Sequence, residues 1–252
     1  MEKRILFILL FGCLFFSCKK NDPTIPMNKI PVSYLELISS FPLNVLEPSG
    51  LCLGPNNATF LTVSDNTNKI YEIDFSGNTL RTLAFKGIDL EGITYNPKLN
   101  TIAVIEEGGR NVVVVDYESG LEIGRYHISI EENSANKGLE GISYNKNNSI
   151  YYIVNEDAPG LLVLWSPMLG IIDEIDLKFA SDYSGIFVDD ANSLLWVVSD
   201  ESKALYKCDY NTNVLHQYNV DELKFEGISI VNNLIYMVND ASAKLYVYKI
   251  KD

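Results

Sequence analysis

Three glutamates stand directly before a glycine at the start of apolar, strand-like segments. They are Glu91 in DLEGITY, Glu140 in GLEGISY and Glu226 in FEGISIV. Serine takes the same place twice, as Ser49 in PSGLCL and Ser184 in YSGIFV. One acid before a glycine is ordinary turn chemistry, but its recurrence at similar spacing predicts a shared place in space. We therefore expect these five residues to surround one channel.

A second set of acids closes the apolar segment that follows each glycine. These segments end in TVSD, VIEE, IVNED, VVSD and MVND. If the first strand follows the channel and the second returns beside it, the second set reaches the face where the first strands begin. Asp and Asn are also good turn formers, so several of these acids are expected to be structural. The set comprises Asp65, Glu106, Glu156, Asp200 and Asp240.

Two acids adjacent to these sets are set aside. Asp89 precedes Glu91 by two residues, but the corresponding place in the next unit is Gly138, so we favour Glu91. Glu107, the second acid of its pair, is expected to be solvated.

Carboxylates that converge on a narrow channel repel one another, so protons or a cation must offset their charge. A hard divalent ion suits them, because Ca²⁺ takes several oxygen ligands at about 2.3–2.6 Å. Zinc is disfavoured, since both histidines, His127 and His216, fall in segments expected at the rim. A wide, hydrated channel without metal is the alternative. The candidate metal ligands are Glu91, Glu140, Glu226, Asp65, Asp200 and Asp240, and the candidate channel lining is Ser49, Ser184, Glu106 and Glu156.

Five units of similar length position these residues. From Ser49 through Glu91, Glu140 and Ser184 to Glu226, the successive spacings are 42, 49, 44 and 42 residues. Each unit predicts four strands separated by turns, the period of a β-propeller blade. The last unit ends after its third strand, and residues 33–41 can supply the fourth. We predict an all-β propeller of five four-stranded blades over residues 32–252, with a diverged sixth blade as the alternative.

The N-terminus predicts export. Residues 1–17 combine a basic start with an apolar run too short to span a membrane, which is typical of a secretory signal. The following FFSC resembles the lipobox of bacterial lipoproteins, with Cys18 as the lipidated residue and residues 18–31 as anchor and tether. An ordinary signal peptide is the alternative. We expect a membrane-anchored lipoprotein of the cell envelope.

Composition narrows the classes of partner. The chain has 252 residues, 47% of them hydrophobic, and a formal net charge of −13. This balance argues against nucleic acid as a partner and is compatible with one large folded domain. Cys52 and Cys208 are expected to be buried thiols rather than a disulfide. The protein is expected to be a monomer.

Residues 47–107 resemble the SdiA-regulated family of bacterial envelope proteins through EPSGL, SDN, IYEID and DLEGI. KGLEGISY and FEGISI extend this resemblance over nearly all of residues 33–252. It implies a β-propeller in the envelope and little chemistry. A looser likeness to calcium-dependent lactonase, gluconolactonase and phytase-type propellers implies that the acids beside the glycines and at the strand ends bind the metal.

Three functions are compatible with these features. The leading prediction is a propeller that binds Ca²⁺ and a small-molecule or protein ligand at its channel mouth. The second is a calcium-dependent hydrolase of an ester, lactone or phosphoester, in which a metal-bound water and a glutamate base act without histidine. The third is a metal-free scaffold. The sequence has no G-x-S-x-G elbow, so a serine triad is improbable.

Overall fold

The computed structural model describes residues 29–130, 138–157 and 159–251. The predicted signal peptide (1–17), the lipidation candidate Cys18 and most of the tether lie outside these residues. Within the three described ranges, no helix has the length and apolarity needed to cross a membrane. The described chain consists of β-strands and a short 3-10 helix, η1 (Pro55–Asn57).

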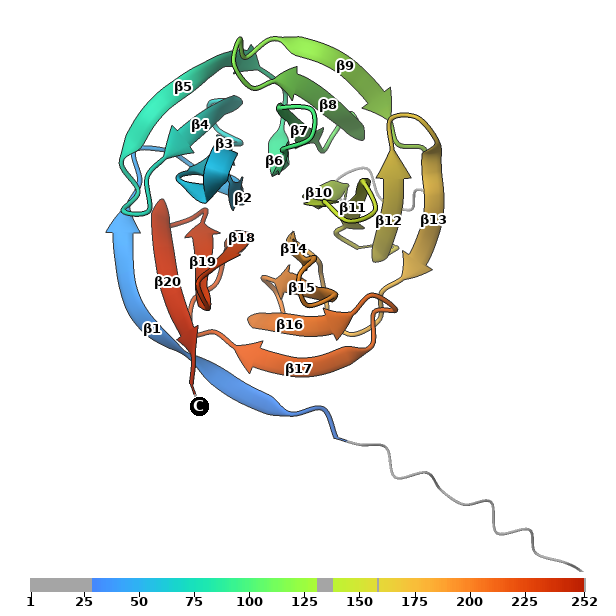
Figure 1. The fold of residues 1–252 in the computed structure, drawn as a ribbon. Helices are drawn as coiled ribbons and strands as arrows, with labels where there is room; N and C mark the ends of the chain where they lie inside the picture. Colours follow the sequence, from blue (N-terminus) through green and yellow to red (C-terminus); the bar gives the residue numbers. More distant parts are fainter. Residues whose placement is uncertain (1–28, 131–137, 158, 252) are drawn as a thin grey trace, which may run out of the picture.

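The strands follow one another from the centre of the molecule to its edge in repeated groups of four (Figure 1). The innermost strands are β2 (Pro48–Leu53), β6 (Leu90–Asn96), β10 (Leu139–Asn145), β14 (Gly185–Asp189) and β18 (Phe225–Val231). The second strands are β3 (Phe60–Ser64), β7 (Thr101–Glu106), β11 (Ile150–Asn155), β15 (Leu194–Ser199) and β19 (Leu234–Asn239). The third strands are β4 (Lys69–Ile73), β8 (Asn111–Asp116), β12 (Leu161–Ser166), β16 (Ala204–Asp209) and β20 (Lys244–Ile250). The outermost strands are β5 (Thr79–Lys86), β9 (Glu122–His127), β13 (Gly170–Asp176), β17 (Val214–Asn219) and β1 (Val32–Pro42).

The N-terminal strand closes the ring of sheets (Figure 1). β1 pairs antiparallel with β20, from Leu35 opposite Ile250 to Pro42 opposite Lys244. Its first residues also pair in parallel with β17, so β14–β17, β1 and β18–β20 form one eight-stranded sheet. The remaining strands form four-stranded sheets. The predicted use of residues 33–41 as the fourth strand of the last unit agrees with this pairing.

Burial explains the composition of the strands. All six residues of β7, TIAVIE, are buried, because neighbouring sheets cover both of its faces. β9, at the outer edge, has the more polar sequence EIGRYH and no buried residue. The apolar side chains pack between consecutive sheets, as Leu61 of β3 does with Ile93 of β6. Leu51 of β2 and Val238 of β19 belong to one cluster, so the same packing joins the first and last groups of strands.

Glycines allow the innermost strands to contact one another. A Cβ atom on Gly50 would lie 2.6 Å from the carbonyl oxygen of Glu91, and one on Gly227 would lie 2.5 Å from the backbone nitrogen of Leu51. No side chain fits at such distances, whereas glycine does. The narrow centre therefore requires the glycine and fixes the place of the residue before it. Equivalent contacts occur at Gly92, Gly141 and Gly185.

Candidate functional site

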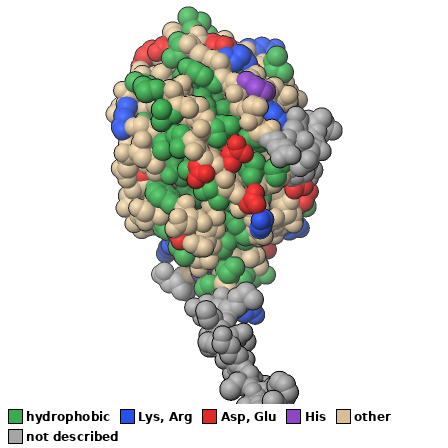
Figure 2. Space-filling model, turned by 90° about the vertical axis from the view of Figure 1, so that its right-hand side faces the viewer, with side chains coloured by type: hydrophobic (Ala, Val, Ile, Leu, Met, Phe, Trp, Pro, Cys, Tyr) green, Lys and Arg blue, Asp and Glu red, His purple; other side chains and the backbone are tan. Residues whose placement is uncertain are grey.

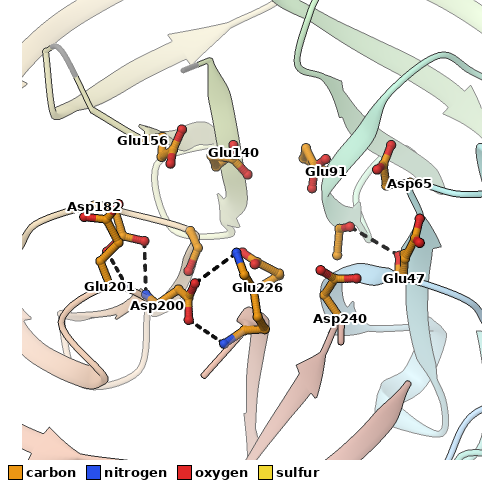
Figure 3. Close-up of a pocket in the computed structure, with 13 residues that line it drawn as sticks. Glu47, Asp65, Glu91, Glu140, Glu156, Asp182, Asp200, Glu201, Glu226 and Asp240 are labelled. Carbon is orange, nitrogen blue, oxygen red and sulfur yellow. Dashed lines mark hydrogen bonds and ion pairs between the residues drawn. The ribbon is translucent and has the colours of Figure 1, made fainter. Parts of the chain in front are cut away.

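An acidic cavity of about 210 Å³ opens on the face where the innermost strands begin (Figure 3). The second strands end on this face, because they run antiparallel to the innermost ones. Among the described residues, ten acidic side chains and one lysine line the cavity. Its lining comprises Glu47, Ser49, Asp65, Glu91, Glu140, Glu156, Asp182, Ser184, Asp200, Glu201, Lys224, Glu226 and Asp240.

The structure brings the five residues that precede the glycines together at this cavity. A β-bulge lies at this place in β2, β6, β10 and β18, as shown by the register shift between Leu90 and Ile93 in β6. Bulges bend a strand and re-aim its side chains. As a result, the carboxylates of Glu91, Glu140 and Glu226 leave the regular pleat and lie around the cavity (Figure 3).

Glu106, which the sequence placed in the channel lining, is not among the described residues that line the acidic cavity. Glu106 is the last residue of β7, is buried, and forms an ion pair with Arg125. It also accepts the backbone N–H of Ile88 at 3.2 Å. The polar residues that end the other second strands bind the neighbouring loops in a similar way, and these are Ser64, Asn155, Ser199 and Asn239.

Glu107, the next residue, is also absent from the lining of the cavity but lies close to two residues that line it. It is half-buried rather than solvated, and its Oε1 accepts the backbone N–H of Gly138 at 2.9 Å. Glu107, Glu140 and Glu156 each offer one carboxylate oxygen, and these atoms lie within 4.8 Å of one another. The first residue after each of the other second strands, Asp65, Glu156, Asp200 or Asp240, lines the cavity, and Glu107 approaches it beside Glu140 and Glu156.

A second group of three carboxylates lies at the adjacent contact between sheets. Asp65, Asp89 and Glu91 offer oxygen atoms that also lie within 4.8 Å of one another. Asp89 accepts the backbone N–H of Gly108 at 2.9 Å, which fixes its carboxylate. Sequence reasoning missed Asp89, although a signal existed: two residues before the Glu or Ser, other units carry Glu47, Asp182 and Lys224.

Lys224 occupies this same place in the last unit and neutralises one acid. Its Nζ lies 3.1 Å from Oδ2 of Asp200, and its backbone N–H donates to Oδ1 of the same residue. The hydrogen bond to Asp200 raises the pKa of Lys224 above its ordinary value. This contact therefore contains its own counter-charge.

An aliphatic ring closes the floor of the acidic cavity. The innermost strands carry Leu or Ile two residues after each Glu or Ser, and the void among these residues and the glycines measures about 10 Å³. That is room for about one water molecule. A separate cavity of about 340 Å³, lined in part by Tyr95, Tyr144 and Phe187, lies beyond this ring. The ring consists of Leu51, Ile93, Ile142, Ile186 and Ile228.

The histidines and cysteines lie away from the acidic cavity. His127 is on β9, and His216 on β17 stacks on Tyr218 with a centroid separation of 4.2 Å. Cys52 and Cys208 are free thiols, and burial raises the pKa of Cys208 to about 12. In the described chain, the cavity therefore offers oxygen ligands and neither imidazole nor thiolate.

A family model for SdiA-regulated proteins matches residues 34–250. The chain belongs to the SdiA-regulated family. No curated protein sequence matches this SdiA-regulated protein.

Solved structures share the fold of the SdiA-regulated protein at low sequence identity. Glutaminyl cyclase from Myxococcus xanthus superposes with a TM-score of 0.70 at 12% identity, over 89% of this chain and 100% of the cyclase. A virginiamycin B lyase from Staphylococcus aureus gives a TM-score of 0.51 at 18% identity, over 81% of this chain and 66% of the lyase. These likenesses support an all-β, propeller-type scaffold of four-stranded sheets.

The crowding of acids disfavours their charged forms in the SdiA-regulated protein. Burial raises the pKa of Glu91 well above its ordinary range, and the charges of Glu226 and Asp65 add to this effect. Burial and the charge of Glu91 do the same for Glu140. Burial raises the pKa of Glu226 to about 8, although Lys224 opposes the shift. Without a cation, burial and mutual repulsion therefore favour the protonated forms of these glutamates.

Asp240 adds a carboxylate oxygen that has no hydrogen-bond donor among the described residues. Burial and the nearby charge of Glu47 raise the pKa of Asp240. Its Oδ1 is buried and accepts no hydrogen bond from the described residues. A buried carboxylate oxygen without a donor is costly, and a bound cation would satisfy it.

Proposed function

We propose that the acidic cavity binds a divalent cation and that Ca²⁺ suits it best. The observation that carries this proposal is the pair of three-carboxylate groups, each with oxygens within 4.8 Å of one another. Two oxygens on opposite sides of a Ca²⁺ ion, with bonds of about 2.4 Å, are about 4.8 Å apart. Among the described lining residues, Lys224 is the one basic side chain, and Asp200 already binds it.

The ligands come from two adjacent contacts between sheets; two residues of each group line the cavity, whereas Asp89 and Glu107 lie outside its lining. Asp65, Asp89 and Glu91 form one group of ligands, and Glu107, Glu140 and Glu156 form the other. The proposal thus retains Asp65, Glu91 and Glu140 from the six ligands expected from the sequence. Asp200 and Glu226 are less suited as ligands, because Asp200 already pairs with Lys224 and the charge of Lys224 also acts on Glu226. The oxygen of Asp240 that has no hydrogen-bond partner among the described residues remains available.

We infer that the ring is a five-bladed propeller. Its eight-stranded sheet counts as two blades, because β1 and β17 pair in parallel over a short register, from Val32 opposite Gln217 to Tyr34 opposite Asn219. Each four-stranded sheet is one further blade. The strands of the described ranges are all used by these blades, so none is left for a sixth.

The ion orients a small-molecule or protein ligand at the cavity mouth. Most carboxylates of the lining converge there from the loops before the innermost strands and after the second strands (Figure 3). The chain is exported, is held at the envelope membrane through Cys18, and acts as a monomer. Residues 18–31 act as the tether, since β1 begins at Val32.

A hydrolase is a weaker candidate than a binding protein. The described lining of the cavity contains no histidine, so a glutamate would have to act as the base for a metal-bound water. The structural relatives include a cyclase and a lyase, but identities of 12% and 18% transfer a fold and no activity. A metal-free scaffold is the weaker alternative, because Asp65, Asp89 and Glu91 bring three carboxylate oxygens within 4.8 Å of one another.

Calorimetric titration with Ca²⁺ tests the cation proposal. The full chain carrying Cys18→Ser should give binding heat and a rise in melting temperature that a chelator reverses. Glu91→Gln and Glu140→Gln should each weaken binding by about 10-fold or more, since each removes one charged ligand. Glu174→Gln, on the exposed strand β13, is the matched control and should bind normally. Absence of both heat and a chelator-sensitive shift would refute the proposal.

A further inference from the structure

Three exposed aliphatic residues stand at equivalent places around the mouth of the acidic cavity. Leu46, Ile88 and Leu223 each lie three residues before Ser49, Glu91 or Glu226. Their exposed fractions are 57%, 73% and 47%. They belong to consecutive positions around the ring, because β18, β2 and β6 are neighbours at the centre (Figure 1). We name these three residues the apolar arc.

The backbone of the apolar arc is held in place by the strand ends. The hydroxyl of Ser64 donates to the carbonyl of Leu46 at 2.5 Å, and the amide of Asn239 donates to the carbonyl of Leu223 at 2.5 Å. The N–H of Ile88 donates to Glu106 at 3.2 Å. The arc is therefore preorganised, which lowers the entropy lost on binding.

Each arc residue precedes a residue with a left-handed backbone. The φ angles are 46° at Glu47, 57° at Asp89 and 67° at Lys224. This conformation is uncommon for residues other than glycine and costs of the order of 1 kcal/mol or more. The same strained turn is thus repeated three times, and each copy places an aliphatic side chain outside the cavity and a charged one beside it.

The outer side of the ring also exposes hydrophobic side chains, such as Leu37 of β1 and Ile123 of β9. Its hydrophobic side chains are interspersed with polar, acidic and basic ones (Figure 2), as is ordinary for a soluble surface. The arc instead places aliphatic side chains next to ten carboxylates and one lysine that is already paired. A surface that complements it must carry positive charge with apolar groups beside it.

We propose that the apolar arc and the acidic cavity form one docking surface for a protein segment that presents a lysine or arginine between apolar side chains. The basic side chain enters the cavity, and the apolar ones cover Leu46, Ile88 and Leu223. A cavity of about 210 Å³ has room for one such side chain and not for a folded element. This inference rests on the proposed function of the cavity mouth as a ligand site, but it does not require that the ion be calcium.

A set of three short peptides tests the docking surface on the full chain carrying Cys18→Ser. The probe is the acetylated, amidated tripeptide Leu-Arg-Leu. In Leu-citrulline-Leu the charge is removed, and in Gly-Arg-Gly the apolar flanks are removed. Binding is followed by NMR titration, once with saturating Ca²⁺ and once with chelator. We expect the probe to bind at least about 10-fold more tightly than either comparison peptide.

Protein variants separate docking from simple charge attraction. The triple variant Leu46→Ser/Ile88→Ser/Leu223→Ser should reduce binding of Leu-Arg-Leu by about 10-fold and leave the calcium heat unchanged. The control Leu99→Ser/Leu121→Ser/Leu169→Ser removes equally exposed leucines from turns after first and third strands and should change neither.

Each other outcome contradicts the docking surface. Equal binding of Leu-Arg-Leu and Gly-Arg-Gly, or normal binding by the arc variant, would reduce the effect to charge attraction alone. Equal binding of Leu-citrulline-Leu would show that the positive charge has no role. Equally tight binding of 1,5-diaminopentane would point to a small organic cation rather than a protein segment. Calcium binding without peptide binding would leave the proposed function standing and remove this inference. Peptide binding that depends on charge and arc, without any calcium heat, would support the docking surface and remove the cation.

Discussion

Two contacts between neighbouring sheets at the acidic cavity differ in how the negative charge of their carboxylates is balanced. At the contact between β15 and β18, Asp200 binds Lys224 with Nζ at 3.1 Å from Oδ2. At the contact between β3 and β6, Asp65 meets Asp89 and Glu91. Lys224 and Asp89 occupy the same place in their loops, two residues before a glutamate, and both have a left-handed backbone.

The difference shows that the charge at this place is determined by the side chain and not by the backbone conformation, which the two contacts share. The same turn can present either a cation or an anion to the glutamate. The lysine supplies an internal counter-charge, while the aspartate at the other contact adds to the repulsion. An acid in that place adds to the repulsion, which a bound cation or a proton would offset.

Exchange of the side chain at the proposed calcium-binding contact should have the largest effect. Asp89→Lys gives this contact the arrangement of Lys224, so Ca²⁺ affinity should fall by about 100-fold, near 3 kcal/mol. The protein should at the same time melt at a higher temperature in chelator. Calorimetry and thermal melts provide both measurements. Asp89→Asn, which removes charge without adding a cation, should have a smaller effect, and wild-type affinity in Asp89→Lys would contradict the assigned ligands.

The reverse exchange should make the lysine-containing contact depend on metal. Lys224→Asp leaves Asp200 and Glu226 without their cation, and the melting temperature in chelator should fall by roughly 6 °C, about 2 kcal/mol after allowance for the half-exposed lysine. Added Ca²⁺ should recover more of the melting temperature than it adds to the wild type. An increment equal to that of the wild type would show that the two contacts are not interchangeable.

Substitutions of Glu107 and Glu106 should distinguish a proposed calcium ligand from a neighbouring residue that stabilises the fold. Glu107→Gln should weaken Ca²⁺ binding by about 10-fold. Glu106→Gln should leave the affinity unchanged and lower the melting temperature, because Glu106 is buried against Arg125. If Glu106→Gln reduced affinity and Glu107→Gln did not, the observed end of β7 would be contradicted.

The pH dependence should differ with and without calcium. Burial raises the pKa of Glu226 from 4.5 to about 8, and burial raises those of Glu91 and Glu140 as well. The folded protein then binds more protons than the unfolded chain across this range, so stability in chelator should fall as pH rises from 4.5 to 8. We expect a decrease of roughly 10 °C in melting temperature, largely removed by Ca²⁺. Thermal melts in which stability in chelator rises with pH would contradict the assigned shifts.

Much of the fold could be predicted because its signals are local and repeated. The glycine that follows Glu91 marks the register of each innermost strand, since the narrow centre excludes a side chain there. The incomplete last unit indicated the closing strand. Such features of the fold can be predicted from the repeat period and from the alternation of apolar and polar residues, both of which are visible in the sequence.

The site was harder to predict because it depends on single-residue register and on contacts between units. Whether Glu106 or Glu107 faces the cavity depends on the residue at which pairing in β7 ends. Alignment of its EE pair with SD, NE and ND in the other units would have selected Glu107. The salt bridge from Lys224 to Asp200 joins residues 24 positions apart, and no local pattern predicts that distance.

The aliphatic floor also imposes an order on binding. The ring of Leu51, Ile93, Ile142, Ile186 and Ile228 leaves a void of about 10 Å³, too small for passage of a hydrated ion. If the proposed ion and the proposed segment are both bound, they share the mouth of the cavity. Calcium beneath a docked segment could then exchange with the surrounding solution only after the segment leaves, so the residence time of the segment would limit calcium exchange.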